Sequence, residues 1–243
     1  FSNVHMIITE KLLGVQSDDF TKLFTVGIQL GAILAVIVLY WKRFVKPLRT
    51  GRWNFYLKLL VAVIPALMLG FIFSDKIDAL LESALTVAIT MIAGGIVLLF
   101  IDRFFRKETI QTEEQISYPK ALMIGCWQCI AMIPGVSRSA ASIIGGMQQN
   151  LTRKLAAEFS FFLAVPTMAA ATGYKLLKGY QSLGAGDIKL FAIGNAVAFI
   201  VAVLAIKFFI GFLQKHGFKL FGYYRIMAGT ILLILILTGV IKE

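Results

Sequence analysis

Arg138 is the clearest candidate in this chain for a residue that takes part in binding or catalysis. It lies in segment 134–139, which reads Pro-Gly-Val-Ser-Arg-Ser, between two apolar stretches that are expected to lie in a membrane. A guanidinium at that depth must face a polar cavity or a partner. The hydroxyls of Ser137 and Ser139 and the backbone N–H groups freed by the break at Gly135 would add donors at a helix N-terminus.

Two roles for Arg138 are open. In one, the guanidinium pairs with a carboxylate or a helix C-terminus and only stabilises the fold. In the other, which the neighbouring donors favour, it binds an anion. The planar fork of an arginine matches phosphate oxygens in pairs, so phosphate or pyrophosphate is the expected ligand.

Ser2 and His5 form the second candidate pair. They are three residues apart, so on a helix they would share one face. A hydroxyl beside an imidazole is the simplest pairing of a nucleophile with a general base. Near a chain end such a pair is more often incidental, and it gains weight if the fold brings it opposite Arg138.

Three other side chains could bind a metal or take part in redox chemistry. Glu158 lies in the first turns of an otherwise apolar span. It could bind a metal, orient Arg138 or lie at a favourable helix N-terminus, and we favour the last. Cys126 and Cys129 form a C-x-x-C pair, which can be a redox pair or half of a zinc site. Because their segment is apolar and no second ligand pair exists, we interpret them as buried small residues.

The composition predicts an integral membrane protein. Of its 243 residues, 58% are hydrophobic and 15% are charged, with a mean hydropathy of +0.82. Soluble domains average roughly 45–50% apolar and about 25% charged residues. The net charge of +11 fits loop charges that set membrane topology, and no basic face with interleaved aromatics suggests a nucleic-acid partner.

Apolar runs bounded by charges predict an all-α protein with about six transmembrane helices and a re-entrant hairpin. Each predicted span is close to the ~20 residues needed to cross the hydrocarbon. Segment 119–150 differs, because Pro134-Gly135 divides it into two halves that are too short to cross. Such a hairpin is stable only where protein buries it or a cavity hydrates it. The predicted spans are 23–43, 56–74, 84–102, 156–177, 187–210 and 221–241.

The distribution of Lys and Arg supports this topology. With loop 44–55 on one face, called side B, seven of the 24 cations fall on the opposite face, side A, and Arg138 lies between them. If segment 119–150 crossed the membrane once, the excess of Lys and Arg on side B would be smaller, which favours the re-entrant path. Because cytoplasmic loops carry an excess of Lys and Arg, side B is predicted to be cytoplasmic and the C-terminus to face outward. The sixteen side-B cations are Lys42, Arg43, Lys46, Arg49, Arg52, Lys58, Arg103, Arg106, Lys107, Lys120, Arg153, Lys154, Lys207, Lys215, Lys219 and Arg225.

A faint inverted repeat is visible within one integral membrane domain, 1–243. Segment 24–31 follows segment 2–5 by about twenty residues, and segment 159–166 follows 137–139 at nearly the same distance. The first repeat would cover about 1–103 and the second about 119–241. Folds of this kind place their binding site where the two repeats meet.

Several motifs resemble the undecaprenyl-diphosphate phosphatases, the bacitracin-resistance family. Segment 133–139 is similar to that family's P-G-x-S-R-S signature, although Ala140 replaces the Gly that usually follows. Segment 125–129, Gly-Cys-Trp-Gln-Cys, also matches. Segments 158–166 and 24–35 resemble its E-F-S-F-L-L-A-V-P and F-x-V-x-I-Q-L-G-A-I-L-A motifs, and the likeness covers essentially the whole chain.

The resemblance implies a multi-pass enzyme of the bacterial inner membrane with its active site facing the outside. Such an enzyme removes one phosphate from undecaprenyl diphosphate and so recycles the lipid carrier of cell-wall synthesis. It implies a divalent cation, Mg²⁺ or Ca²⁺, as cofactor, and it leaves the oligomeric state open, a homodimer included. By this resemblance Ser2, His5 and Arg138 are catalytic, and Gly135, Ser137, Arg138 and Ser139 bind substrate.

The first motif departs from the family's E-G-x-T-E-F-L-P-V-S-S-T-G-H. Ser2 and His5 match, but Phe1, Asn3 and Val4 replace Ser, Thr and Gly. The two glutamates of the motif would precede Phe1, so the chain is expected to be truncated there or to lack a piece, and its metal ligands are unknown.

The residues leave mechanism and function class partly open. Ser2, His5 or a water molecule could attack phosphorus, with Arg138 stabilising the developing charge. A polyprenyl-phosphate transporter or flippase is the alternative function, because broken helices in inverted repeats are typical of transporters. Transport needs an anion site but no nucleophile, so release of phosphate distinguishes the two.

Overall fold

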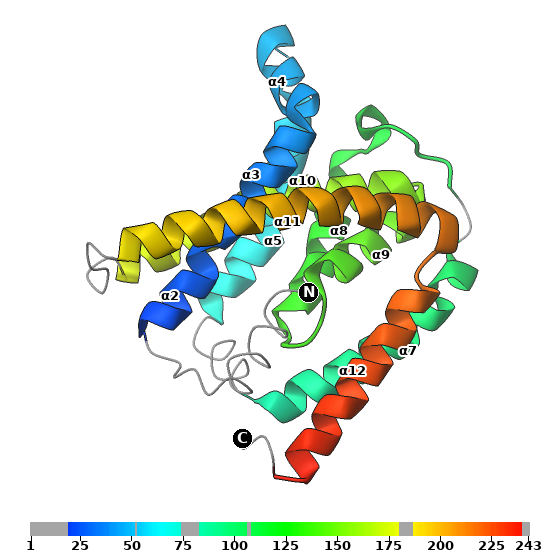
Figure 1. Ribbon diagram of the computed structural model, residues 1–243. Coiled ribbons are helices and arrows are strands. Elements are labelled where there is room, and N and C mark those ends of the chain that lie inside the picture. Colours follow the sequence, from blue (N-terminus) through cyan, green and yellow to red (C-terminus); the bar gives the residue numbers. More distant parts are fainter. Residues whose placement is uncertain (1–18, 52, 74–82, 106–107, 180–186, 240–243) are drawn as a thin grey trace.

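The computed structural model describes residues 19–51, 53–73, 83–105, 108–179 and 187–239, and within them the chain is helical without a strand. One isolated bridge joins Ile110 and Leu151. Figure 1 shows the arrangement of the helices. The elements are α2 (Asp19–Gly27), α3 (Gln29–Leu39), α4 (Trp41–Thr50), α5 (Asn54–Ile72), α7 (Ala84–Phe104), η1 (Glu113–Gln115), α8 (Tyr118–Cys129), η2 (Ile130–Met132), α9 (Arg138–Gln148), α10 (Arg153–Gly179), α11 (Asp187–His216) and α12 (Lys219–Leu237).

Five of the described helices are long and apolar enough to cross a membrane: α5, α7, α10, α11 and α12. They match five of the predicted spans, and an all-α polytopic membrane fold is confirmed. Helix α11 is strongly apolar, yet protein buries only 11% of its most apolar stretch. A long apolar helix that protein covers over so little of its surface faces lipid over most of the rest.

The predicted span 23–43 is not one continuous helix. It breaks at Ile28 into α2 and α3, and the chain turns again at Tyr40 before α4. The N–H of Gly31, in the first turn of α3, donates to Oδ1 of Asn195 at 2.7 Å. A Cβ on Gly31 would overlap the carbonyl oxygen of Asn195, so this glycine lets α3 and α11 approach closely. Asn195 thus supplies the interhelical hydrogen bond expected of a polar residue within a span.

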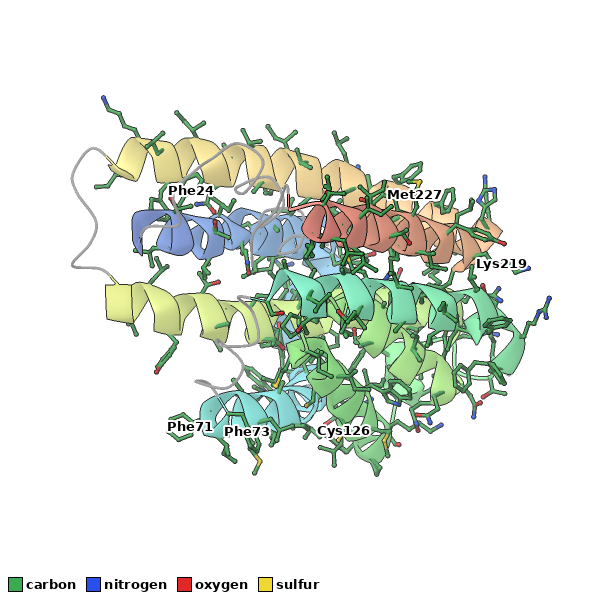
Figure 2. All side chains as sticks on the ribbon, turned by 90° about the horizontal axis from the view of Figure 1, so that it is seen from below. Phe24, Phe71, Phe73, Cys126, Lys219 and Met227 are labelled. Atoms are coloured by element: carbon green, nitrogen blue, oxygen red, sulfur yellow. The ribbon has the colours of Figure 1, made fainter. Side chains whose placement is uncertain are left out.

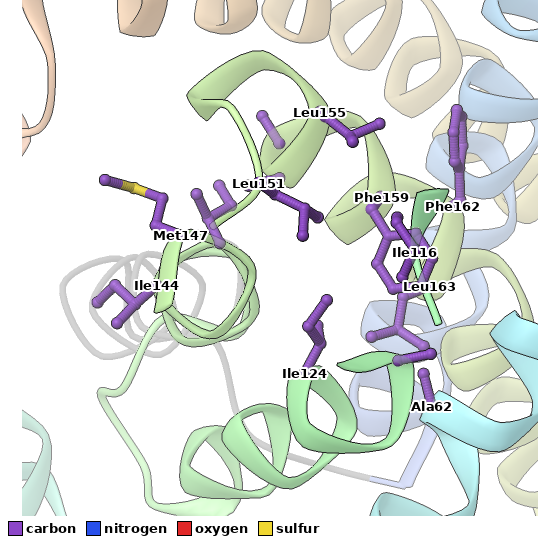
Figure 3. Packing of buried hydrophobic residues seen from close by; sticks show 14 of the residues in the cluster. Ala62, Ile116, Ile124, Ile144, Met147, Leu151, Leu155, Phe159, Phe162 and Leu163 are labelled. Carbon is purple, nitrogen blue, oxygen red and sulfur yellow. The ribbon is translucent and has the colours of Figure 1, made fainter. Parts of the chain in front are cut away.

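Segment 118–148 forms the predicted pair of half-length helices. Helix α8 has 12 residues and α9 has 11, so each is roughly 17 Å long at 1.5 Å per residue, against about 30 Å of hydrocarbon. Side chains from both halves join the main core with α10, among them Ile124, Ile144 and Phe159 (Figure 3). Protein therefore buries the hairpin, as irregular backbone at this depth requires.

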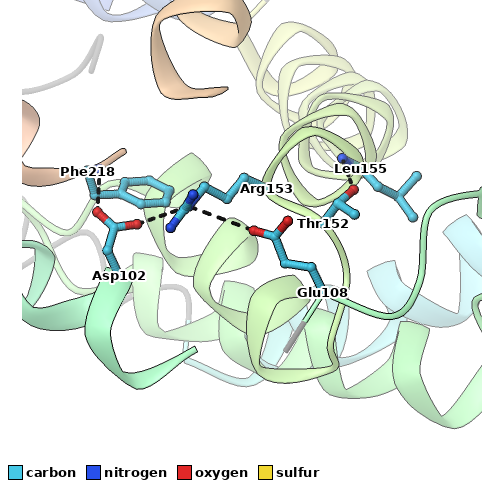
Figure 4. Close-up of polar contacts among 6 residues, drawn as sticks. All are labelled: Asp102, Glu108, Thr152, Arg153, Leu155 and Phe218. Carbon is cyan, nitrogen blue, oxygen red and sulfur yellow. Dashed lines mark hydrogen bonds and ion pairs between the residues drawn. The ribbon is translucent and has the colours of Figure 1, made fainter. Parts of the chain in front are cut away.

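Both ends of the hairpin lie on the same face of the bundle. Nε of Arg153, at the start of α10, lies 3.1 Å from Oδ1 of Asp102, near the end of α7 (Figure 4). The other oxygen of Asp102 accepts a hydrogen bond from the backbone N–H of Phe218, just before α12, at 2.8 Å. Since α7 ends where α10 begins, the segment between them enters and leaves on one face, which confirms the predicted re-entrant path.

A second polar network joins the start of α5 to the loop before the hairpin. Nζ of Lys58 donates to the carbonyl oxygens of Glu113 and Glu114 at 2.9 and 3.0 Å. The carboxylate of Glu113 pairs with Arg43 of α4. Lys58 is 8% exposed, so this side-B lysine is a buried anchor for the loop, whereas the charge pattern alone indicated a topology charge.

Replacing Lys58 by methionine is expected to destabilise the fold by roughly 2–4 kcal/mol, because two carbonyl groups lose a charged donor inside the protein. Thermal unfolding of the purified protein in detergent measures the change. Lys42→Met is the matched control, since it removes the same charge from an exposed position in α4. Equal melting temperatures for the two variants would contradict the anchoring role.

Candidate active site

The site is built at the N-terminus of α9, at the tip of the hairpin. Ser137 is the N-cap, and its Oγ accepts a hydrogen bond from the backbone N–H of Ala140 at 3.3 Å. The hydroxyls of Ser137 and Ser139 lie 3.1 Å apart. Backbone N–H groups and the helix dipole at such a terminus favour an anion. The structure therefore brings together the predicted substrate-binding residues Gly135, Ser137, Arg138 and Ser139.

Arg138 is the first residue of α9 and points toward α10. One of its terminal nitrogens donates to the carbonyl oxygen of Ser160 at 3.2 Å. Among the described residues no carboxylate forms an ion pair with it. A purely structural role, in which Arg138 pairs with a carboxylate, thus finds no partner in the described part of the chain. The contact to Ser160 holds one edge of the guanidinium and leaves further donors for a ligand.

A buried serine pair fixes the orientation of α9 on α10. Oγ of Ser142 and Oγ of Ser160 lie 2.6 Å apart, and both residues are fully buried. Ser142 also donates to the carbonyl oxygen of Arg138 at 2.9 Å. The side chain and the backbone of Arg138 are therefore both connected to Ser160. These contacts join the segment around residue 160 to the Arg138 motif, a link that spacing alone did not reveal.

The turn before α9 is held by α7 and α12. Gly135 has φ +83°, a conformation that glycine adopts readily. The hydroxyl of Thr90 donates to the carbonyl oxygen of Pro134. Arg225 donates to the carbonyl oxygen of Gly135 at 2.7 Å and, more weakly, to that of Thr90 at 3.4 Å.

Arg225 corrects the interpretation of the charge pattern. It was assigned to side B as a topology charge, but its side chain is only 6% exposed and reaches the turn at the hairpin tip. A signal existed in the sequence, because Arg225 lies four residues inside the predicted span 221–241, where a charge is costly. Its partner, 90 residues away, could not be read from the pattern.

The cysteine interpretation is wrong in part. Cys126 is exposed on the outer face of α8 (Figure 2). Cys129 is partly exposed, and its thiol donates to the carbonyl oxygen of Gly125. The apolar character of the segment reflects contact with lipid on this face rather than burial in protein.

Of the three remaining candidate groups, the structure describes only Glu158. Ser2 and His5 lie outside the described part of the chain, so their roles stay predictions. Glu158 is the sixth residue of α10 and 9% exposed, and it lies in electrostatic range of Lys154 and Arg43, on the side-B part of the helix.

The described residues contain no group of three or more His, Cys, Asp and Glu side chains that could hold a metal ion. The hairpin tip supplies hydroxyl groups and carbonyl oxygens, but no pair of carboxylates. This part of the chain therefore does not fit a divalent cation by itself, and no step at the site is derived through one.

Comparison with known proteins decides the family. Residues 2–231 match the model of the family described as bacitracin resistance protein BacA. The chain belongs to the BacA family. Curated relatives named undecaprenyl-diphosphatase include one from Flavobacterium psychrophilum, 58% identical over 96% of this chain and 88% of its own length. Another, from Flavobacterium johnsoniae, is 56% identical over 96% of this chain and 88% of its own length, and one from Porphyromonas gingivalis is 51% identical over 98% and 91%.

Membership in the BacA family confirms the expected resemblance over nearly the whole chain. In this BacA protein the signature around Arg138 is the N-terminus of a half-length helix held by three neighbours, α7, α10 and α12. The inverted repeat stays a prediction, because the first motif lies outside the described residues.

Proposed function

We propose that this chain hydrolyses undecaprenyl diphosphate to undecaprenyl phosphate and inorganic phosphate, as the names of its relatives indicate. The observation that carries the proposal is the N-terminus of α9. It combines a guanidinium free of a described carboxylate partner, two hydroxyls and helix N–H groups in one place. These are the donors that a diphosphate requires, and lipid-facing helices such as α11 suit its polyprenyl chain.

In the proposed reaction, Arg138 and the N–H groups of α9 bind the terminal phosphate. A nucleophile attacks its phosphorus, and the bond to the bridging oxygen breaks with undecaprenyl phosphate as leaving group. Arg138 stabilises the charge that develops on the oxygens in the transition state. The nucleophile is Ser2, His5 or water, and His5 is the candidate proton carrier. A covalent intermediate on Ser2 or His5 would then be hydrolysed by water.

Release of phosphate from a polyprenyl diphosphate tests the proposal directly. The protein, purified in detergent, is expected to release phosphate in a protein-dependent manner. The same protein in vesicles reports flux of a labelled polyprenyl phosphate. Flux without release in either preparation would support transport and overturn hydrolysis.

A divalent cation is part of the proposal on the strength of the resemblance alone, with its ligands outside the described residues. Chelation with EDTA is expected to abolish phosphate release, and added Mg²⁺ or Ca²⁺ is expected to restore it. Full activity in EDTA, with no metal detected by elemental analysis of the purified protein, would remove the cation from the proposal.

The orientation is also proposed. The polar networks of Arg153 and Lys58 lie on side B, and the excess of cations there supports our proposal that side B is the cytoplasmic face of a bacterial inner membrane. The hairpin tip then points toward the outside. Labelling of single cysteines in loop 108–117 and near residue 239 with an impermeant reagent tests this, since only the second should react in intact cells. Light scattering of the detergent complex tests whether the protein is a homodimer.

A further inference from the structure

Arg225 is a second arginine within a predicted membrane span, and its side chain contacts the turn that directly precedes Arg138 and α9. It lies in the second turn of α12 and crosses α7 at Gly94, where an added Cβ would come within 2.9 Å of its terminal nitrogen. Its side chain ends at the carbonyl oxygens of Gly135 and Thr90. Two arginines therefore lie at the N-terminus of α9. Arg138 belongs to α9 and extends toward α10, whereas Arg225 reaches the preceding turn from α12.

The burial and incomplete pairing of Arg225 are unfavourable for a residue whose only role is to pack α7 on α12. The side chain is 6% exposed, and its Nε is buried without a hydrogen-bond partner among the described residues. Among these residues no carboxylate forms an ion pair with it. A buried charge that lacks full pairing is unfavourable compared with an apolar side chain of similar size. Packing of α7 on α12 alone would therefore be better served by a residue such as leucine or methionine.

Arg225 and Thr90 together hold two successive carbonyl groups. Thr90 donates to the carbonyl oxygen of Pro134 and Arg225 to that of Gly135, and only Val136 separates Gly135 from the N-cap Ser137. The orientation of these two peptide groups determines where the following N–H groups and the start of α9 point. Arg225 also lines a small pocket with Ser137 and Ser139, with room for about one water molecule.

We propose that Arg225 is a positioning residue for the reaction, acting through the carbonyl of Gly135 on the N–H donors and guanidinium at the start of α9. This inference rests on the proposed hydrolysis, because it assigns Arg225 a part in the geometry of that reaction. Arg225 does not touch the substrate in this proposal. A displacement of about 1 Å in groups that bind a transition state can lower a rate about 10²-fold.

The test compares Arg225→Gln, Arg225→Lys and Thr90→Val with Lys219→Gln. The control removes one positive charge from an exposed position on the same helix. For Arg225→Gln we expect kcat for phosphate release to fall about 30–100-fold with KM within about twofold, since the loss occurs in the transition state. Arg225→Lys keeps a charged donor and is expected to recover most of the rate. Thr90→Val is expected to lower kcat about 3–10-fold, and the control to leave it unchanged.

A measurement independent of activity separates positioning from folding. Amide hydrogen exchange of segment 133–141 is expected to be faster in Arg225→Gln than in the unmutated protein, while α7 and α10 keep their protection. A rise in KM at constant kcat would mean that Arg225 binds the substrate directly, and would overturn the proposal. Loss of protection throughout the protein, in both Arg225 variants, would mean a purely structural role and would also overturn it.

The experiments distinguish a failure of the proposed hydrolysis from a failure of the positioning role of Arg225. If the unmutated protein releases no phosphate, hydrolysis is wrong, whereas the exchange measurement still reports whether Arg225 holds the loop. Unchanged exchange in segment 133–141 would reject the positioning role, whatever the activity.

Discussion

Replacement of Arg138 by lysine is expected to lower kcat for phosphate release about 10²–10³-fold in a protein that remains folded. This is the size of effect seen when one preorganised donor to a developing anion is removed. Lysine keeps the positive charge but cannot present two parallel donors to phosphate oxygens. It also loses the geometry that allows one nitrogen to bind the Ser160 carbonyl while the others face the ligand.

The Arg138 experiment needs a control for charge and for folding. Arg103→Lys makes the same replacement at an exposed position near the end of α7, and its activity is expected to match that of the unmutated protein. Thermal unfolding and size-exclusion profiles check that both variants fold. Near-full phosphate release by folded Arg138→Lys would rule out a paired-donor role for this guanidinium.

Gly135→Ala is expected to remove almost all activity and to destabilise the fold. The residue has φ +83°, and such a conformation costs about 1–3 kcal/mol for other residues. A Cβ there would also overlap Oγ1 of Thr90 and lie 2.7 Å from the carbonyl oxygen of Val87. Because the second of these atoms is helix backbone, the loop must move away from α7, and the start of α9 moves with it.

Gly51→Ala provides a matched control for Gly135→Ala. Gly51 has φ +67°, but nothing lies within 4 Å of the position of its added Cβ. Both variants carry the strain of a positive φ, and only the one at residue 135 carries the clash beside the site. We expect at least a tenfold greater loss of phosphate release for Gly135→Ala. Equal losses would mean that the approach of the loop to α7 does not matter for the reaction.

Much of the fold follows from local sequence patterns. Continuous apolar runs of about twenty residues predict membrane helices, and five of the six predicted spans exist in the structure. The Pro-Gly break predicts two half-length helices in 119–150, and α8 and α9 confirm them. The exception, span 23–43, breaks at Ile28, and the amide of Asn195 on a distant helix supports the start of α3. Hydropathy alone does not encode such support.

In the candidate site, too, the sequence indicates some of the residues and only the structure shows the others. Arg138 and its serines stand out in the sequence because a charge and hydroxyls beside a helix break are costly in an apolar segment unless they bind a polar group. The parts that surround them did not stand out. The carbonyl of Ser160 and the hydroxyl of Thr90 are groups that many helices contain, and they acquire a role only through the packing of α10 and α7 on the hairpin.

By itself, the sequence determined that the chain is a membrane protein and that it contains a re-entrant segment, and it predicted an anion site at the break in that segment. These properties depend on composition and on neighbours within a few residues. The tertiary structure alone decided that Arg225 is buried at the loop and that Cys126 faces outward. Apart from Arg225 and the lysine at its start, α12 is largely apolar on all sides, so its sequence does not specify which neighbours its inward side meets; only packing against neighbouring helices selects them.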